Sequence, residues 1–176
     1  GTPVQDIVER AGVTKGAMYH YFRAKDDLLF EIYSGVYREQ FASLELILAK
    51  EADPVTTLRA VIEDVVTTTA TYIREARVFA RDSWRIDAAR WHELQANWRR
   101  YQDSVRGVIR DGQESGEFST AASPEVVSWS IFGLTNSMPS WFRPDGPKPA
   151  ATIAAELAGL ILAGLRPTTT EGKPQP

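Results

Sequence analysis

The chain has 176 residues, of which 43% are hydrophobic and 10% aromatic, enough to bury a substantial core. Its formal net charge of −3 argues against a protein that coats nucleic acid through general basicity. The absence of cysteine excludes disulfides, thiolate zinc sites and thiol catalysis, and fits a cytoplasmic protein. No apolar run approaches the roughly 20 residues of a membrane span, and no signal segment opens the chain, so we expect no membrane partner.

Residues 4–22 are predicted to form two short helices around a tight turn. Gly12 ends the first helix and Thr14 caps the second. Met18 and Phe22 are four residues apart and therefore point to the same, inner side of the second helix. Four residues are left on its outer face: Lys15, Gly16, Tyr19 and His20. This pattern is typical of a helix-turn-helix, whose second helix enters the DNA major groove, but an ordinary helical hairpin shows the same periodicity.

The charges of this N-terminal segment cancel. Across residues 1–30, four basic side chains are balanced by four acidic ones, which weakens the attraction to DNA phosphates. Residues 15–25, in contrast, carry three basic side chains and no acidic one. Since a dimer presents this basic surface twice, we expect DNA binding to require two copies of the chain.

The run GVTKGAMYHYF at residues 12–22, followed by KDDLL at residues 25–29, resembles the DNA-binding signature of TetR-family transcriptional regulators. The resemblance implies an N-terminal helix-turn-helix domain and a C-terminal helical domain that binds an effector and dimerises. It also implies that five residues face bases or sugars: Lys15, Gly16, Ala17, Tyr19 and His20. Three further residues are implied to meet phosphates: Thr14, Tyr21 and Lys25.

Two features depart from the family pattern. Ala24 stands where the family often has a capping serine or asparagine, so the next helix start relies on Asp26 and Asp27 interacting with the helix dipole. The sequence also begins at the second family helix, so the first helix is missing. We interpret Gly1 as the start of a truncated or partly ordered chain.

Apolar periodicity predicts five more helices, at residues 25–50, 54–75, 76–116, 123–142 and 150–165. Asp53-Pro54 and Ser123-Pro124 are helix-start signals, with a capping side chain before a proline at the first helical position. The predicted fold class is therefore all-α. We divide the chain into a helix-turn-helix domain (1–40), an effector-binding and dimerisation domain (41–166) and a flexible tail (167–176).

Candidate effector-binding residues come from two stripes on the predicted helix 76–116. Three arginines, at positions 77, 81 and 85, are spaced by four and form either a solvated face or an anion site. Three tryptophans, at positions 84, 91 and 98, are spaced by seven and form either core or a wall for a flat, apolar ligand. The predicted effector-binding set is Arg77, Arg81, Trp84, Trp91, Trp98, Met138 and Trp141.

Helices 123–142 and 150–165 of each subunit are expected to form a four-helix dimer interface, since the first is apolar on more than one side and the second is rich in small residues. The segment 141–147, with Gly-Glu-Phe at 116–118, distantly resembles a TetR branch that controls fatty-acid or steroid catabolism and responds to acyl-CoA thioesters. We therefore expect a homodimeric repressor of a double-stranded, inverted-repeat operator, with a hydrophobic small molecule or an acyl-CoA thioester as effector.

The sequence offers little from which to build an active site. Its two histidines are His20, in the predicted reading helix, and His92 beside Glu93. No serine lies in a nucleophile-elbow context, and no glycine-rich phosphate loop is present. We expect no enzymatic activity, no cofactor and no bound metal. The alternative hypothesis is a helical small-molecule sensor without sequence-specific DNA binding.

Overall fold

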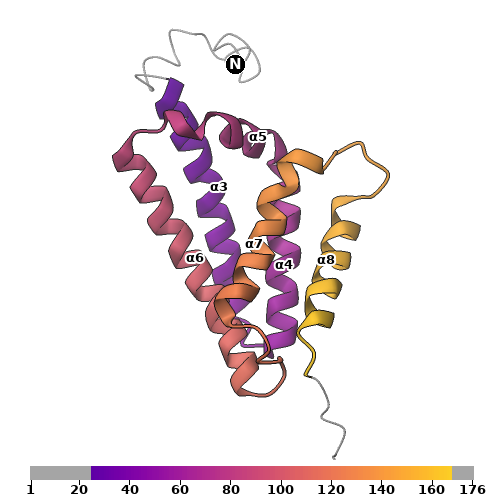
Figure 1. Cartoon of the computed structure of the whole chain (residues 1–176). Coiled ribbons are helices and arrows are strands. Elements are labelled where there is room, and N and C mark those ends of the chain that lie inside the picture. Colours follow the sequence, from indigo (N-terminus) through magenta and orange to yellow (C-terminus); the bar gives the residue numbers. More distant parts are fainter. Residues whose placement is uncertain (1–24, 168–176) are drawn as a thin grey trace, which may run out of the picture.

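The computed structural model describes residues 25–167. These residues form an all-α bundle, which confirms the predicted fold class (Figure 1). Its elements are α3 (Lys25–Leu48), α4 (Pro54–Thr71), α5 (Ile73–Asp82), the short 3₁₀ helix η1 (Ser83–Arg85), α6 (Ala88–Glu114), α7 (Pro124–Trp141) and α8 (Ala150–Gly164). The helix-turn-helix predicted within residues 1–22 lies outside the described residues. None of the helices described is long and apolar enough to cross a membrane.

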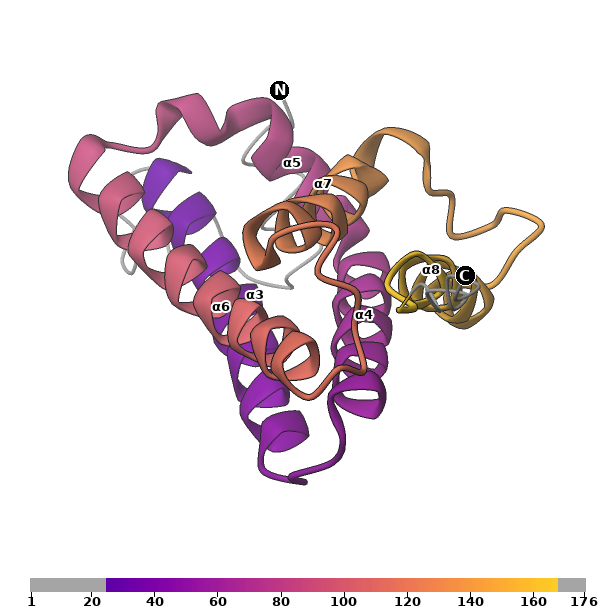
Figure 2. The ribbon, with the colours of Figure 1, turned by 60° about the horizontal axis from the view of Figure 1, so that its bottom comes forward.

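Helix α4 is the centre of the bundle. It packs against α3, α6, α7 and α8, and Figure 2 shows α8 on the side of α4 that faces away from α3 and α6. The inner face of α4 carries apolar residues at helical spacing: Leu58, Val61, Ile62, Val65 and Val66, all buried. Each such side chain contributes about 1.5–3 kcal/mol on burial, so α4 supplies much of the core that holds the other helices in place.

The predicted helix-start signals are confirmed at atomic detail. The Asp53 carboxylate accepts the backbone N–H of Thr56 at 2.8 Å, and this hydrogen bond lowers the pKa of Asp53. The Ser123 hydroxyl accepts the N–H of Val126 at 3.4 Å, and α7 then begins at Pro124 as predicted. These local signals were sufficient because the capping side chain and the proline act within one helical turn.

The predicted helix 54–75 is wrong in its C-terminal part. Helix α4 ends at Thr71, and α5 begins at Ile73 after a break at Tyr72. The hydroxyls of Thr67 and Thr71 bond to backbone carbonyls one turn earlier, a pattern that weakens a helix. The Tyr72 hydroxyl then donates to Glu39 of α3, a tertiary contact that periodicity does not reveal.

The predicted continuous helix 76–116 is also wrong, because the chain bends between α5 and α6. Ile86 adopts an extended conformation and is buried together with Leu29 of α3 and Leu94 of α6. Asp87 then starts α6 by accepting the N–H of Arg90 at 3.0 Å. The bend therefore follows from burial of Ile86 and from the new N-cap Asp87. It places Trp84 and Arg85, which lie in η1, on a different element from the other residues of their predicted stripes.

Candidate effector cavity

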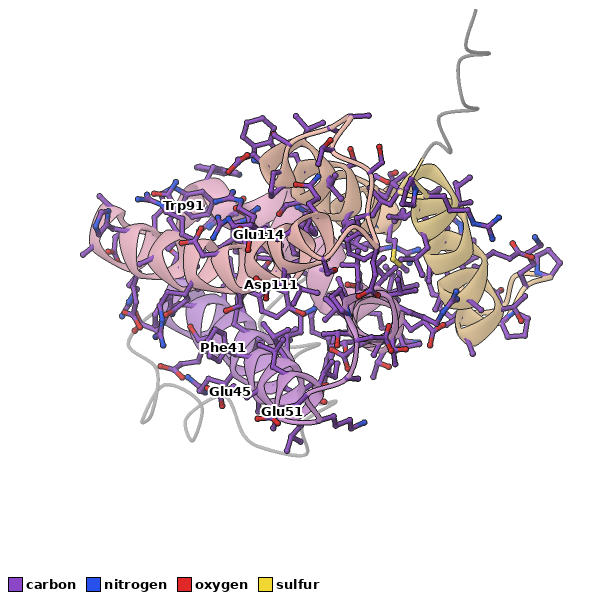
Figure 3. The ribbon with its side chains drawn as sticks, turned by 90° about the horizontal axis from the view of Figure 1, so that it is seen from below. Phe41, Glu45, Glu51, Trp91, Asp111 and Glu114 are labelled. Atoms are coloured by element: carbon purple, nitrogen blue, oxygen red, sulfur yellow. The ribbon has the colours of Figure 1, made fainter. Side chains whose placement is uncertain are left out.

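A cavity of about 400 Å³ lies between α3, α4, α5, α6 and α7. This volume falls in the range that holds a drug-sized molecule. Its lining comprises Tyr33, Val36, Tyr37, Gln40, Val65, Thr69, Tyr72, Glu75, Ala76, Phe79, Ala80, Trp91, Leu94, Gln95, Trp98, Tyr101, Thr135, Asn136 and Pro139. Figure 3 shows Trp91 on α6, the helix that lies beside α3 in Figures 1 and 2.

Aromatic rings from three helices form most of the apolar wall. Tyr33 stacks on Phe79 with a centroid distance of 3.4 Å and an interplanar angle of 9°, and Phe79 stacks on Trp91 at 6.1 Å. Farther along, Trp98 meets Tyr37 edge to face at 5.7 Å. Because aromatic pairs prefer stacked and edge-to-face arrangements, these rings support one another and leave a preformed, flat-sided space.

Polar groups lie among these rings. Burial raises the pKa of Tyr33 to about 12 and raises the pKa of Tyr37 further, so both phenols stay neutral at physiological pH. Among the described residues, no lysine or arginine lines the cavity, and Glu75 is its one acidic side chain. The interior therefore suits uncharged polar groups better than anions.

Two of the predicted effector-binding residues, Trp91 and Trp98, line the cavity. Trp84 does not: it belongs to η1 and is 78% exposed. Met138 is fully buried in the core, and Trp141 is exposed and donates its indole N–H to the Ser137 hydroxyl at 2.9 Å. The structure thus brings together two of the five apolar residues of the predicted set.

The predicted arginine stripe does not form a common anion site. The Arg77 guanidinium donates to the carbonyl oxygens of Pro139 and Phe142, at 3.1 and 2.5 Å, and so holds the end of α7. Arg81 pairs with its neighbour Asp82 at 3.0 Å, and Arg85 pairs with Asp26 at 3.0 Å. The bend after α5 is the physical reason, since it places Arg85 off the helix that carries Arg77.

Sequence reasoning missed most of the cavity. Apolar periodicity places Tyr33, Tyr37 and Tyr101 on the inner faces of predicted helices but does not mark them as cavity residues, and it does not single out Phe79. A signal was present in the number of aromatic residues on the inner faces of helices 25–50 and 76–116. That signal does not distinguish a filled core from a cavity, because both are lined by the same residue types.

Two ion pairs join the start of α3 to the bend beside the cavity. Arg85 of η1 pairs with Asp26, and Arg90 of α6 pairs with Asp27 at 2.5 Å. Hydrogen bonding to Asp27 raises the pKa of Arg90. Trp91, next to Arg90, lines the cavity. The cavity wall is therefore connected directly to the first turn of the helix that follows the predicted reading segment.

The predicted DNA-binding residues Thr14, Lys15, Gly16, Ala17, Tyr19, His20 and Tyr21 lie outside the described residues. Lys25 begins α3, which places its backbone at the end of the helix nearest the two ion pairs. Among residues 25–167, no three histidine, aspartate or glutamate side chains gather in a group that could hold a metal ion.

A helical bundle with an aromatic cavity, behind a segment with helix-turn-helix patterning, defines a ligand-binding regulator. Residues 1–32 match the family described as "Bacterial regulatory proteins, tetR family", and residues 51–165 match "Tetracyclin repressor-like, C-terminal domain". The chain belongs to the TetR family of transcriptional regulators.

Relatives of known name or structure agree with this assignment. The chain is 26% identical over 169 residues to the HTH-type transcriptional repressor KstR2 of Rhodococcus jostii, covering 93% of this chain and 81% of the relative. The crystal structure of the regulator PfmR from Thermus thermophilus superposes with a TM-score of 0.84 at 28% identity, over 94% of this chain and 90% of PfmR. AibR in complex with isovaleryl coenzyme A and operator DNA shares the fold, with a TM-score of 0.76 at 22% identity over 91% of this chain and 86% of AibR.

Proposed function

We propose that this protein is a homodimeric repressor that binds an inverted-repeat operator and releases it when an apolar effector enters the cavity. The observation that carries the proposal is the position of α3. This helix begins just after the predicted reading segment and supplies Tyr33, Val36, Tyr37 and Gln40 to the cavity wall. An effector that displaces these side chains acts on the helix that directly follows the predicted DNA-binding segment in the chain.

The coupling between the two sites is reciprocal. An effector that prefers one arrangement of α3 lowers operator affinity, and operator DNA lowers effector affinity by the same factor. A coupling of about 1–3 kcal/mol corresponds to a roughly 5- to 150-fold change in operator affinity. The ion pairs of Asp26 and Asp27 with Arg85 and Arg90 are the contacts through which we expect the cavity wall to move α3.

The effector is proposed to be a hydrophobic small molecule, or the acyl part of a CoA thioester. The aromatic cavity supports an apolar body of drug-like size. A related structure supports the thioester variant, since AibR was crystallised with isovaleryl coenzyme A and operator DNA. In that case the acyl group occupies the cavity and the CoA phosphates lie outside it, because no basic residue among those described lines the cavity.

Dimerisation is proposed through α7 and α8. Both helices pack on α4 with one face and leave large apolar side chains exposed on the other, with Trp129 of α7 at 60% and Leu160 of α8 at 67% exposure. Exposed apolar side chains that continue along an element are typical of an interaction surface. A dimer then carries two copies of the basic residues 15–25, one for each half of an inverted repeat.

The effector proposal is tested with a thermal-shift panel on the full chain, containing CoA thioesters, uncharged hydrophobes and aromatic acids. Compounds that raise the unfolding temperature are then added to the complex of the protein with an operator selected from random DNA. We expect at least one compound of the first two classes to stabilise the protein and to release the operator. Stabilisation without release by every such compound would contradict an effector-responsive repressor.

The DNA-binding proposal is tested with the double variant Tyr19→Ala, Lys25→Ala. We expect it to lose the operator band shift while remaining a dimer in sedimentation, because both residues belong to the implied DNA contacts. Lys50→Ala is the matched control, since it removes a lysine from beyond the other end of α3. Normal operator binding by the double variant would favour the alternative, a helical sensor without sequence-specific DNA binding.

A further inference from the structure

Glu75 lines the effector cavity from α5, the helix that packs on both α3 and α7 at the end of the bundle where α3 begins (Figure 1). The break before α5 and α5 itself contribute lining residues at helical spacing: Tyr72, Glu75, Ala76, Phe79 and Ala80. Residues three and four apart lie on one face of a helix. The partly buried side chain of Glu75 therefore leaves the helix on the same side as the rings of Tyr72 and Phe79.

The Glu75 carboxylate has no partner among the residues that the structure describes: none of them joins it in a hydrogen bond or an ion pair. The residues three and four positions away on either side are all uncharged, so α5 offers no cation at the usual spacing of a helical ion pair. Arg77 lies on another face of α5 and donates to the carbonyl oxygens of Pro139 and Phe142 instead. Within the described part of the chain, the cavity thus holds one carboxylate and no counter-ion.

The surroundings of Tyr72 show the same excess of negative charge. The Tyr72 hydroxyl donates to the Glu39 carboxylate of α3, so this phenol is already in use. The hydrogen bond to Glu39 raises the pKa of Tyr72, and the nearby Glu75 carboxylate contributes to the rise. Glu39 is satisfied by the phenol, which leaves Glu75 as the carboxylate that a ligand in the cavity meets.

Aromatic rings lie within reach of this carboxylate. Phe79 follows Glu75 by one helical turn, about 5.4 Å along the helix axis. Its ring stacks between Tyr33, at 3.4 Å, and Trp91, at 6.1 Å, and both of these residues also line the cavity. Because the faces of such rings attract an organic cation within about 6 Å, the wall and the carboxylate favour the same kind of ligand.

The charge of the lining separates four classes of ligand. An anion in the cavity loses its hydration and meets a like charge, and a neutral ligand removes water from Glu75 without replacing it. A metal ion lacks ligands, since no three acidic or histidine side chains gather among residues 25–167. An organic cation with an apolar body compensates the carboxylate, contacts the rings and buries its own apolar surface.

We propose that Glu75 is the specificity-determining residue of the cavity and pairs with the single positive charge of a lipophilic, ring-bearing organic cation, such as an aromatic amine carrying a protonated or quaternary nitrogen. This inference rests on the proposed effector function and names the chemical class of the effector. It favours the small-molecule form of that effector over the acyl part of a CoA thioester, which carries no positive charge.

The test uses three probes with the same ring and different charges, each dialysed to equilibrium against an excess of the full chain. The cation is trimethyl(naphthalen-2-ylmethyl)ammonium. The neutral probe is 2-neopentylnaphthalene, in which carbon replaces the charged nitrogen, and the anion is 2-naphthylacetate. Burial of apolar area alone favours the neutral probe, so a preference for the cation reports on charge. We expect the wild-type protein to bind the cation about 5- to 30-fold more tightly than the neutral probe, which corresponds to about 1–2 kcal/mol, and to bind the anion least.

The deciding variant is Glu75→Gln, which removes the charge and keeps the length of the side chain. We expect it to lose the preference for the cation and to bind the neutral probe at least as tightly as the wild-type protein does. Glutamine and glutamate have similar helix propensities, so the unfolding temperature should stay close to the wild-type value. Glu75→Asp keeps the charge and should retain a preference for the cation, which separates the effect of charge from that of shape.

Glu93→Gln is the matched control for net charge. Glu93 is exposed on α6 and does not line the cavity, so its loss changes the overall charge of the protein by the same amount. This variant should bind all three probes as the wild-type protein does. An equal loss of cation binding in Glu93→Gln would show a general attraction to an acidic protein and would overturn the inference.

Three further results would overturn it: a preference for the cation that survives in Glu75→Gln, tighter binding of either other probe by the wild-type protein, or no binding of the cation at all. Operator release, measured in parallel, reports on the proposed function separately. Release by a neutral compound or a thioester that Glu75→Gln leaves unchanged, without any preference for the cation, rejects the role of Glu75 and leaves the repressor function in place. Glu75-dependent binding of the cation without operator release rejects the effector response and leaves the cavity chemistry in place.

Discussion

At the scale of single residues, two glycines on α6 show how close packing and helix propensity act separately. A Cβ at Gly112 would lie 2.5 Å from Cε2 of the buried Phe118 ring, whereas a Cβ at Gly107 would meet no atom within 4 Å. We predict that Gly112→Ala destabilises the protein by about 1–3 kcal/mol through overpacking. Gly107→Ala should stabilise it by about 0.5–1 kcal/mol, because alanine is the better helix former.

Urea unfolding of both variants checks this prediction. The two substitutions are chemically identical and lie on the same helix, so any difference between them reports the space around the Cβ. Equal destabilisation of both variants would mean that α6 tolerates no side chain at either position, contrary to the open surroundings of Gly107.

Asp64 is expected to make the protein less stable as pH rises, whereas a capping carboxylate such as Asp53 makes it more stable. Burial raises the pKa of Asp64, although a hydrogen bond donated by Ser43 partly offsets this effect. Between the unfolded value of about 3.9 and the raised folded value, the folded protein binds more protons, so stability from this group falls as pH rises. We therefore predict that Asp64→Asn gains stability relative to the wild-type protein between pH 4 and pH 7.

Asp53→Asn is the natural comparison for this measurement. Hydrogen bonding to Thr56 lowers the pKa of Asp53, so its contribution is present above the unfolded pKa and is lost as pH falls. The wild-type protein should therefore lose stability relative to Asp53→Asn as pH falls below about 4, and change little relative to it between pH 4 and pH 7. Urea unfolding from about pH 3 to pH 7 measures the two trends, and trends of the same sign would show that one of the two environments is misassigned.

At the residue scale, the sequence was informative wherever the interaction is local. The caps at Asp53 and Ser123 act within one turn and were predicted correctly. The partners of Arg77 and Arg85 were not predicted, because they lie at the C-terminal end of α7 and at the start of α3, far away in sequence. Sequence spacing places a side chain on a helix face only as long as the helix continues.

At the scale of elements, the ion pairs between α3 and the α5–α6 bend are predicted to transmit the effector signal. We expect the double variant Arg85→Gln, Arg90→Gln to bind the effector normally, since neither residue lines the cavity. The effector-induced loss of operator affinity should become about 2- to 30-fold smaller, which corresponds to about 0.5–2 kcal/mol of coupling. Operator titrations with and without a releasing compound from the thermal-shift panel measure this ratio.

Arg59→Gln controls for the loss of an exposed ion pair as such. Arg59 pairs with Glu63 within α4, so its removal changes no connection between elements. Surface pairs contribute about 0–1 kcal/mol to stability, so both variants should unfold at nearly the wild-type temperature. Unchanged coupling in the double variant would show that the signal passes through the aromatic stack alone.

The element order was largely predictable, but the joints that shape the cavity were not. Helices α3, α7 and α8 match their predicted ranges closely: the apolar pattern is continuous within each of them, and the Ser123-Pro124 signal marks the start of α7. The breaks at Tyr72 and Ile86 depend on a hydroxyl reaching Glu39 and on burial against Leu29. Tertiary contacts override helix propensity at such positions, so periodicity continues through them without a visible signal.

At the scale of the whole molecule, the helical domain and its candidate cavity were predictable as a type of site but not as a set of residues. Trp91 and Trp98 were found because their spacing survives within α6. The tyrosines of α3 and Phe79 of α5 complete the cavity only after the bend brings α5 across α3. Whether apolar faces close into a core or leave a space depends on packing among five elements, which no single helix pattern contains.

The final prediction concerns assembly. Leu160 of α8 and Leu46 of α3 are equally exposed, at 67% and 69%, but only Leu160 belongs to the proposed dimer surface. In a dimer, Leu160→Glu buries a charge without a partner, which costs about 3 kcal/mol or more and raises the dimer dissociation constant over 100-fold. Sedimentation should therefore show a folded monomer for Leu160→Glu and an intact dimer for Leu46→Glu. Since one chain carries only one basic reading surface, the monomer should also lose operator binding. Dissociation by Leu46→Glu rather than by Leu160→Glu would move the interface to α3.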